Sequence, residues 1–223
     1  IVGLMPTVLA LASSAHCGTV YVWCGSTGDP DGLAWNTAFH TVQQGIDAAS
    51  SGDQVWVAGG CVYSERITLK DGVALYGGFP SGGGSWASRN PAAHETVIDG
   101  GQGGSVVTVP ANASSGTVID GFTIRNGKAT YGGGITCGSG ASPTITNNLI
   151  SQNTATSYGG GIFGGGVISG NRIGGNSAGS SGGGIFCGTT SAVISGNFIS
   201  DNRAAWGGGI RFHSSTGEIT GNI

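Results

Sequence analysis

Two aspartates in the same short sequence context are the first candidates for chemistry. Asp99 and Asp120 each follow an isoleucine and precede a glycine, and they lie 21 residues apart, with Arg125 close behind. Stacked in neighbouring turns of a repetitive fold, two such carboxylates could act as acid and base in glycoside cleavage, or hold calcium beside a basic residue. The alternative is structural, because an aspartate before glycine commonly bonds the backbone of its own turn. The turn interpretation is favoured. Asp99, Asp120 and Arg125 are kept as catalytic candidates, but the sequence assigns no catalytic role to any of them.

Aromatic side chains at repeated positions form the second set of candidates. Five of them stand next to, or just after, runs of three glycines: Tyr131, Tyr158, Phe163, Phe186 and Trp206. Where Tyr131, Tyr158 and Trp206 directly precede the glycines, Ser181 holds the same place in the remaining copy. Flat aromatic faces at a regular spacing suit sugar rings, although rings stacked at a corner also arise from packing alone. The pattern predicts a carbohydrate-binding face, with packing as the open alternative.

The elements that must position these residues are copies of one short repeat. A Gly-Gly-Gly-Ile sequence occurs four times, with successive copies 27, 23 and 25 residues apart, at residues 132–135, 159–162, 182–185 and 207–210. The unit lacks the two long amphipathic stretches of a helical repeat, and its length suits one turn of a solenoid of parallel strands. The sequence therefore predicts an all-β fold: a right-handed, single-stranded parallel β-helix (solenoid) with an N-terminal capping helix. That helix is expected at residues 36–49, where apolar residues recur at helical spacing.

The aligned copies predict which side chains point inward. Because side chains alternate across a strand, one isoleucine column is expected in the interior, at Ile135, Ile162, Ile185 and Ile210. The next column contains Phe163 and Phe186 but also Arg211, which predicts that it faces solvent. An inward ladder of amide bonds between coils is expected at Asn148, Asn171, Asn197 and Asn222. A second column is expected to mark the next turn, where asparagine tolerates left-handed backbone, at Asn153, Asn176 and Asn202.

The composition excludes several classes of protein. Glycine supplies 47 of the 223 residues and charged residues only 9%, without the three-residue period of collagen, and the regular apolar columns argue against disorder. The net charge of −3 comes with no basic patch, so nucleic acid is not an expected partner. No cysteine pair or histidine cluster has the spacing of a zinc site. We therefore expect no metal and no cofactor, with calcium needed only if the protein is a lyase.

The cysteines predict one disulfide bond. Cys24 and Cys61 each lie just past an expected strand and could bridge in an exported chain. Cys137 and Cys187 share one column, but two coils separate them by about 9–10 Å, beyond the limit of about 7 Å between the Cα atoms of a disulfide. These two are expected to be buried thiols that pack as small apolar side chains.

The N-terminus predicts export. Residues 4–12 are apolar and lead to small residues before His16, so residues 1–15 are interpreted as the remnant of a signal peptide. This stretch is too short to span a membrane, and no transmembrane helix is expected in the fragment. Residues 16–223 are expected to form one β-helix domain, with an N-terminal cap at 19–53 and coils at 54–223. Because the sequence lacks an initiator methionine and stops within a repeat, we expect a fragment truncated at both ends.

Several sequence blocks carry a resemblance to known proteins. They are residues 35–49, 51–53, 55–58, 72–79, 89–90, 97–100 and 120–124. These blocks are similar to the N-terminal module of bacterial right-handed parallel β-helix repeat proteins, and the Gly-Gly-Gly-Ile copies resemble the repeats of polymorphic outer-membrane proteins. The resemblance covers roughly residues 19–223. It implies a pectin-lyase-like fold in an exported or surface-anchored protein, and most members of that group have no assigned activity.

Three functions follow as hypotheses. The first is a non-catalytic β-helix, secreted or on the cell surface in association with the outer membrane, that presents a face to a polysaccharide or a host or cell-surface glycan, or acts in adhesion. The second is a polysaccharide lyase or glycoside hydrolase, which the few carboxylates after Phe122 disfavour. The third is a passive stalk, which a regular rod would suit.

Overall fold

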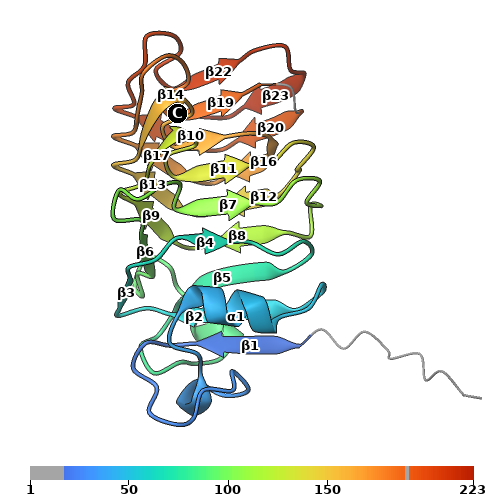
Figure 1. Ribbon diagram of the computed structural model, residues 1–223, viewed down its shortest axis with the longest axis vertical. Helices are drawn as coiled ribbons and strands as arrows, with labels where there is room; N and C mark the ends of the chain where they lie inside the picture. Colours follow the sequence, from blue (N-terminus) through green and yellow to red (C-terminus); the bar gives the residue numbers. More distant parts are fainter. Residues whose placement is uncertain (1–17, 189–190) are drawn as a thin grey trace, which may run out of the picture.

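The computed structural model describes residues 18–188 and 191–223, which wind through successive coils of short strands (Figure 1). The strands of neighbouring coils pair in parallel, in register from one coil to the next. This arrangement confirms the predicted parallel β-solenoid with one short N-terminal α-helix. The predicted signal-peptide remnant at residues 1–15, and Cys17, lie outside the described residues.

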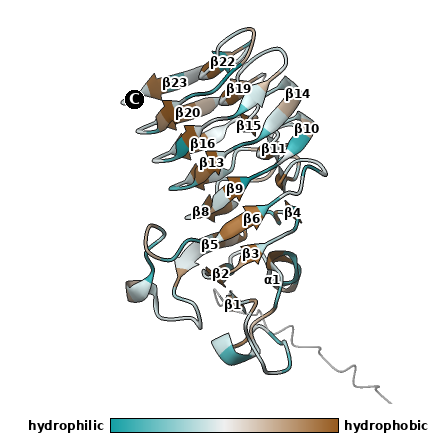
Figure 2. Cartoon of the chain, turned by 90° about the vertical axis from the view of Figure 1, so that its left-hand side faces the viewer, coloured by the Kyte–Doolittle hydropathy of each residue, from teal (hydrophilic) through white to brown (hydrophobic). Residues whose placement is uncertain are grey.

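The strands of successive coils line up in sheets along the long axis of the molecule (Figures 1 and 2). Within the described residues, the first sheet has eight strands: β1 (Thr19–Val22), β2 (Gln54–Ala58), β5 (Ala74–Phe79), β8 (Val118–Asp120), β12 (Thr144–Thr146), β16 (Gly166–Ser169), β20 (Ala192–Ser195) and β23 (Gly217–Thr220). The second sheet has six: β3 (Val62–Tyr63), β6 (Val97–Asp99), β9 (Thr123–Arg125), β13 (Leu149–Ser151), β17 (Arg172–Gly174) and β21 (Phe198–Ser200).

Two further sheets complete the wall of the solenoid. The third sheet has six strands in the described chain: β4 (Ile67–Thr68), β7 (Val107–Val109), β11 (Ile135–Cys137), β15 (Ile162–Phe163), β19 (Ile185–Cys187) and β22 (Ile210–Phe212). A short sheet has three: β10 (Lys128–Tyr131), β14 (Thr154–Tyr158) and β18 (Ser177–Ala178). One coil runs from β12 through β13, β14 and β15, and then enters the next coil at β16.

The core is a set of apolar columns inside these coils. Ile135, Ile162 and Ile185 pair with one another along the third sheet and are fully buried. This confirms the predicted inward column. Burial of the columns removes apolar surface from water in every coil, which is the main stabilising contribution available to a fold with so few charges.

Asparagine amides form the predicted ladder at the corner between the first and second sheets. Oδ1 of Asn171 accepts two hydrogen bonds from Asn148, one from its backbone N–H (3.0 Å) and one from the side-chain Nδ2 of Asn148 (3.1 Å). Nδ2 of Asn171 donates to the carbonyl of Ile145 (2.8 Å) and to Oδ1 of Asn197 (3.0 Å), and Asn197 bonds Asn222 in the same way. Asn148, Asn171 and Asn197 are almost fully buried. Because each amide has partners for both its oxygen and its nitrogen, burial leaves no group unpaired.

The second asparagine column lies at the next corner, as predicted, but it is another ladder and does not have the expected left-handed backbone. Asn153 and Asn176 are buried, and Asn153 Nδ2 donates to Asn176 Oδ1 (3.1 Å). Asn176 Nδ2 in turn donates to Asn202 Oδ1. The left-handed backbone belongs to the residue just before the ladder, as at Gln152, where φ is +58°. A buried amide needs hydrogen-bond partners in the coils above and below, and the coil spacing supplies them. The sharp bend of the backbone is made by the residue before each asparagine.

The triple glycines form the corner between the short sheet and the third sheet. The first, Gly132, has a φ of +58°, a conformation that glycine adopts at little cost. A Cβ on the second, Gly133, would lie 2.6 Å from the carbonyl oxygen of Gly160 in the next coil. Neighbouring coils therefore approach too closely for any side chain at this corner, which explains the repeated motif and leaves its flanking residues to define the surface.

The N-terminal segment differs in two ways from the prediction. Instead of one helix over 36–49, a 3-10 turn at η1 (Trp35–Thr37) precedes α1 (Val42–Ala48), and Phe39 between them forms a bridge with Val22. Thr41 caps α1 in a reciprocal pair with Gln44, and the Glu65 carboxylate accepts from the first N–H groups of the helix. The helix packs on β1, β2 and β4. In addition, β1 already belongs to the first sheet, one coil earlier than expected.

The cysteines follow the prediction. Cys24 and Cys61 form a disulfide bond with their Cα atoms 6.4 Å apart. Cys137 and Cys187 are free and buried, and burial raises the pKa of both thiols to about 12. Gly164 lies in the coil between them, where a Cβ would meet Cys137. A thiol that stays protonated in this way is a poor nucleophile.

Candidate functional site

The two candidate aspartates do not stack on each other, which corrects the first prediction. Asp99 ends β6 in the second sheet, whereas Asp120 ends β8 in the first sheet. The residue that pairs with Asp99 in the next coil is Arg125, 26 positions later. A step of 21 residues therefore takes the chain only part of the way round a coil, and the shared Ile-Asp-Gly context did not reveal this.

Asp99 and Arg125 form an ion pair. Arg125 Nε donates to Asp99 Oδ2 at 2.9 Å, the Asn126 amide donates to the same oxygen at 2.8 Å, and the Gly101 N–H donates to Oδ1. Partial burial raises the pKa of Asp99, but these donors outweigh it and hold the pKa below its ordinary value. The bond to Gly101 is the turn interaction that the sequence favoured. A carboxylate held in its ionised form is poorly suited to donating a proton as a general acid.

Asp120 is also fully engaged. Arg89 forms an ion pair with its Oδ1, while the Thr146 hydroxyl (2.6 Å) and the Asn147 amide (2.7 Å) donate to Oδ2. The carboxylate is buried. These partners join one loop and two coils, so the geometry assigns Asp120 a structural role in holding the residue 80–95 segment against the solenoid.

The five aromatic candidates, by contrast, come together on one surface. They line a depression of about 450 Å³ together with Ser180, Ser181, Arg211 and His213, which we call the upper aromatic groove. The ring centroids of Tyr131 and Tyr158 are 5.7 Å apart with the planes 11° from parallel, and those of Phe163 and Phe186 are 5.7 Å apart at 2°. Tyr158 also stacks on Phe186, at 4.7 Å. Two stacked columns therefore meet beside the triple-glycine corner.

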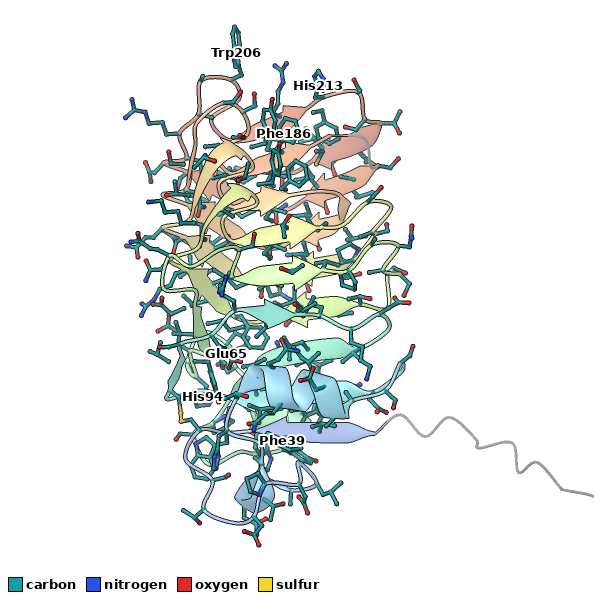
Figure 3. All side chains as sticks on the ribbon, viewed as in Figure 1. Phe39, Glu65, His94, Phe186, Trp206 and His213 are labelled. Atoms are coloured by element: carbon teal, nitrogen blue, oxygen red, sulfur yellow. A yellow bond between two sulfur atoms is a disulfide. The ribbon has the colours of Figure 1, made fainter. Side chains whose placement is uncertain are left out.

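The exposure of the rings differs from the prediction in one place. Phe186 lies in the outward column of the third sheet, as predicted, but it is buried to 6% exposure because Tyr158 and Phe163 cover it. Trp206 is 64% exposed and Tyr131 is 45% exposed. In Figure 3, Trp206 and His213 project from the last coil, with Phe186 one level below. The groove thus combines buried rings that position it with exposed rings that a ligand could touch.

A missing ring opens the groove. Tyr158 pairs with Ser181 and Ser181 pairs with Trp206 in successive coils, so the serine interrupts an otherwise aromatic column. Since strands are about 4.8 Å apart, two coils separate Tyr158 from Trp206 by about 9–10 Å. Ser181 is itself buried and has no bulk to fill that space. The sequence showed the serine as a break in the aromatic column, and in the structure the ring of Phe186, from the same coil as Ser181, stacks on Tyr158 instead.

Arg211 and His213 are groove residues that the sequence analysis did not select. Arg211 pairs with Phe186 and extends the outward column by one coil. Its Nε is buried and has no hydrogen-bond partner among the described residues. The only sequence signal was the presence of arginine in an aromatic column, which was interpreted as a mark of solvent exposure.

A second aromatic group lies at the other end of the stack and serves as a reference. This lower aromatic cluster consists of Tyr21, Trp35, Trp56, Tyr76, Phe79 and Trp86. Trp56 stacks on Phe79 with centroids 4.6 Å apart, and Trp86 packs against both. The indole of Trp35 donates to the Gly84 carbonyl at 3.0 Å. The rings of the lower aromatic cluster thus pack against one another, and Trp35 is also hydrogen-bonded to a nearby loop.

The sequence comparison identifies the family of this chain. A family model described as a protein of unknown function, DUF1565, matches residues 27–220. The chain belongs to the DUF1565 family. No curated protein and no solved structure matched the sequence. The matched region of this DUF1565 chain includes the upper aromatic groove and most of the lower aromatic cluster, so both features lie in the part of the chain that defines the family.

The described part of the DUF1565 chain has neither a metal-ligand cluster nor a helix suited to crossing a membrane. No group of three or more His, Cys, Asp or Glu side chains there could hold a metal ion. None of its helices in the same residues has the length and apolar character needed to cross a membrane. The upper aromatic groove is therefore the candidate site that the geometry supports best.

Proposed function

We propose that this protein is an exported or surface-attached β-solenoid that binds carbohydrate in the upper aromatic groove and does not cleave it. The observation that carries the proposal is a single depression of about 450 Å³ lined by stacked rings, beside which Tyr131 and Trp206 remain exposed. The exposed rings of Tyr131 and Trp206 offer faces that a flat ring can contact at ordinary distances of about 3.5–4.0 Å. Sugar rings present such apolar faces.

The size and lining of the groove support this proposal. Its volume of about 450 Å³ lies within the range of small-ligand sites, about 300–1,000 Å³. The rings supply contact area, while Ser180, Ser181 and Arg211 supply polar atoms that would select an orientation. The similarity of the Gly-Gly-Gly-Ile copies to repeats of polymorphic outer-membrane proteins supports an extracellular location, where glycans are available.

The state of the aspartates supports a non-catalytic role. Asp99 and Asp120 belong to different sheets, and each is bound by an arginine and an asparagine amide. The donors around Asp99 hold its pKa below the ordinary value, whereas a catalytic acid needs a raised pKa. Neither aspartate is among the residues that line the upper aromatic groove.

Filling the upper aromatic groove at Ser181 gives the sharpest test of carbohydrate binding. Ser181→Tyr would complete the aromatic column, so it should abolish retention on immobilised polysaccharides while keeping or raising the melting temperature. Trp206→Ala should also weaken retention without loss of stability. The matched control is Phe198→Ala, which removes another exposed ring, at 41% exposure, from the second sheet outside the groove.

Two results would reject the proposal. Unchanged retention in Ser181→Tyr would mean that the aromatic columns only pack against each other. Release of reducing or unsaturated ends from a polysaccharide by the purified protein, lost in Asp99→Asn or Asp120→Asn at unchanged stability, would establish the lyase or hydrolase alternative instead.

A further inference from the structure

Arg211 is the one arginine whose buried donor is left without a partner. Among the described residues, its Nε is the only buried side-chain nitrogen or oxygen that makes no hydrogen bond. Arg89 and Arg125, by comparison, each pair with an aspartate. Buried polar groups are nearly always bonded, so an exception calls for a specific explanation. The position of Arg211 supplies one, because this residue lines the upper aromatic groove.

The polar lining of the groove is cationic and hydroxylic. The described residues that contribute polar side-chain atoms to it are Tyr131, Tyr158, Ser180, Ser181, Arg211 and His213, and none of them is a carboxylate. The serine and tyrosine hydroxyls can both donate and accept hydrogen bonds, whereas Arg211 only donates them and has no carboxylate among these residues to pair with. A set rich in donors and positive charge, without a negative partner, suits a ligand that brings its own anionic oxygens.

We infer that the upper aromatic groove selects saccharides that carry an anionic group, and that Arg211 is the residue that binds it. The inference rests on the proposed carbohydrate function. The shared chemistry is a carboxylate or a sulfate ester on the sugar. A guanidinium can hold two oxygens of such a group through Nε and an adjacent terminal nitrogen, while Tyr158 and Trp206 contact the ring. Turning Nε toward those oxygens would give it the partner that it lacks among the described residues.

Isothermal titration calorimetry with matched oligosaccharides tests the inference. The probes are β-1,4-linked hexamers of glucose, of glucuronic acid and of 6-sulfated glucose, which differ only in the group on C6. Hydrogen bonds to charged groups predict that the full protein binds an anionic hexamer about 10- to 100-fold more tightly than the glucose hexamer. The arm that binds more tightly identifies carboxylate or sulfate as the preferred group.

Two arginine variants show whether Arg211 carries this preference. Arg211→Gln should remove most of the difference between anionic and neutral hexamers, because it removes the charge that only the anionic hexamers can pair with. Arg211→Lys retains the charge without the two-nitrogen fork and should keep part of the preference. It also serves as the second variant if Arg211→Gln folds poorly. The matched control is Arg172→Gln, an exposed arginine that packs on Phe198 outside the groove.

The outcomes separate this inference from the proposed function. Equal binding of neutral and anionic hexamers, with no effect of Arg211→Gln, would overturn the anionic preference and leave carbohydrate binding intact. Failure of all three hexamers to bind, together with unchanged polysaccharide retention in Ser181→Tyr, would overturn both.

Discussion

The lower aromatic cluster and the upper aromatic groove contain similar rings, but the polar groups beside them differ in whether they already have hydrogen-bond partners. In the lower aromatic cluster, the Trp56 indole donates to Gln54 at 2.8 Å, and Arg89 lies over Trp86 while it pairs with Asp120. In the upper aromatic groove, Trp206 stacks on no other ring of the described chain and Arg211 Nε has no partner. The comparison shows that aromatic content alone does not identify a binding surface. The informative feature is whether the polar atoms around the rings are already satisfied.

A second difference concerns how each region is covered. The lower cluster is overlaid by the segments around Trp35 and residues 80–91, which bring their own aromatic and arginine side chains to it. The upper groove lies on regular coils, where the repeat leaves short corners and no long loop between β14 and β19. The irregular coils therefore use aromatic residues to attach insertions, whereas the regular coils leave them facing outward.

The largest expected effect is loss of stability when the lower cluster is truncated. Phe79 is fully buried and contacts three tryptophans, so Phe79→Ala should destabilise the protein by about 3–5 kcal/mol. Trp206→Ala, at an exposed position, should change the free energy of unfolding by only about 0.5 kcal/mol or less. Urea denaturation measures both. Similar losses in the two variants would remove the distinction between a packed cluster and a groove.

The disulfide bond should stabilise the lower region in particular. It joins Cys24, just after β1, to Cys61, just before β3, and it closes a loop with a sequence separation of 37. Removing a bond that closes a loop of this size should cost about 2–4 kcal/mol. In Cys24→Ser/Cys61→Ser, hydrogen exchange should accelerate in β1 and α1 while polysaccharide retention persists. If retention fell in step with protection of β1, the groove would depend on the lower coils and the two regions could not be treated separately.

The third effect concerns the amide ladder at the corner between the first and second sheets. Asn171→Leu would leave Asn148 N–H and Nδ2 without their acceptor and Ile145 without a donor. Each buried group left unpaired costs about 1–3 kcal/mol, so the melting temperature should fall clearly. Thr154→Leu, which puts the same side chain at an exposed strand position, is the control. An unchanged melting temperature in Asn171→Leu would show that the ladder contributes no net stability.

The regular half of the fold could be predicted from the sequence because repetition supplies internal evidence. Four copies of one motif placed the isoleucine columns and the first asparagine ladder, and each copy tested the others. The lower half has no such copies. The helix was therefore predicted too long, since the apolar spacing from Phe39 to Ile46 does not distinguish a helix from a 3-10 turn followed by the Phe39 bridge.

The candidate site could be predicted only in part, for a physical reason. The aromatic columns follow from register, which the repeats reveal. Whether Arg211 Nε has a hydrogen-bond partner depends on which groups of neighbouring coils reach it, and the spacing of residues in the sequence does not reveal those contacts. The aspartates were misplaced for a related reason, because Asp99 and Asp120 share a context but not a position in the coil.

The smallest expected effect distinguishes the paired arginine of the lower half from the unpaired arginine of the upper half. Arg125 is bound to Asp99, whose pKa in the folded protein lies below its ordinary value of 3.8. A carboxylate with a lowered pKa adds stability that is complete above the unfolded pKa and is lost as pH falls through the folded pKa. Because the pair is accessible to solvent, its contribution should be about 1 kcal/mol or less.

Asp99→Asn should therefore reduce stability slightly at pH 7 and make the free energy of unfolding less dependent on pH below about pH 4, near the unfolded pKa of an aspartate. Arg211→Gln should leave that dependence as in the unaltered protein, because no carboxylate in the described chain forms an ion pair with Arg211. Urea titrations at a series of pH values between neutrality and strong acid compare the two variants. A change in acid sensitivity caused by Arg211→Gln would mean that this arginine already has an anionic partner within the protein, and the contrast between a satisfied lower cluster and an unsatisfied upper groove would no longer hold.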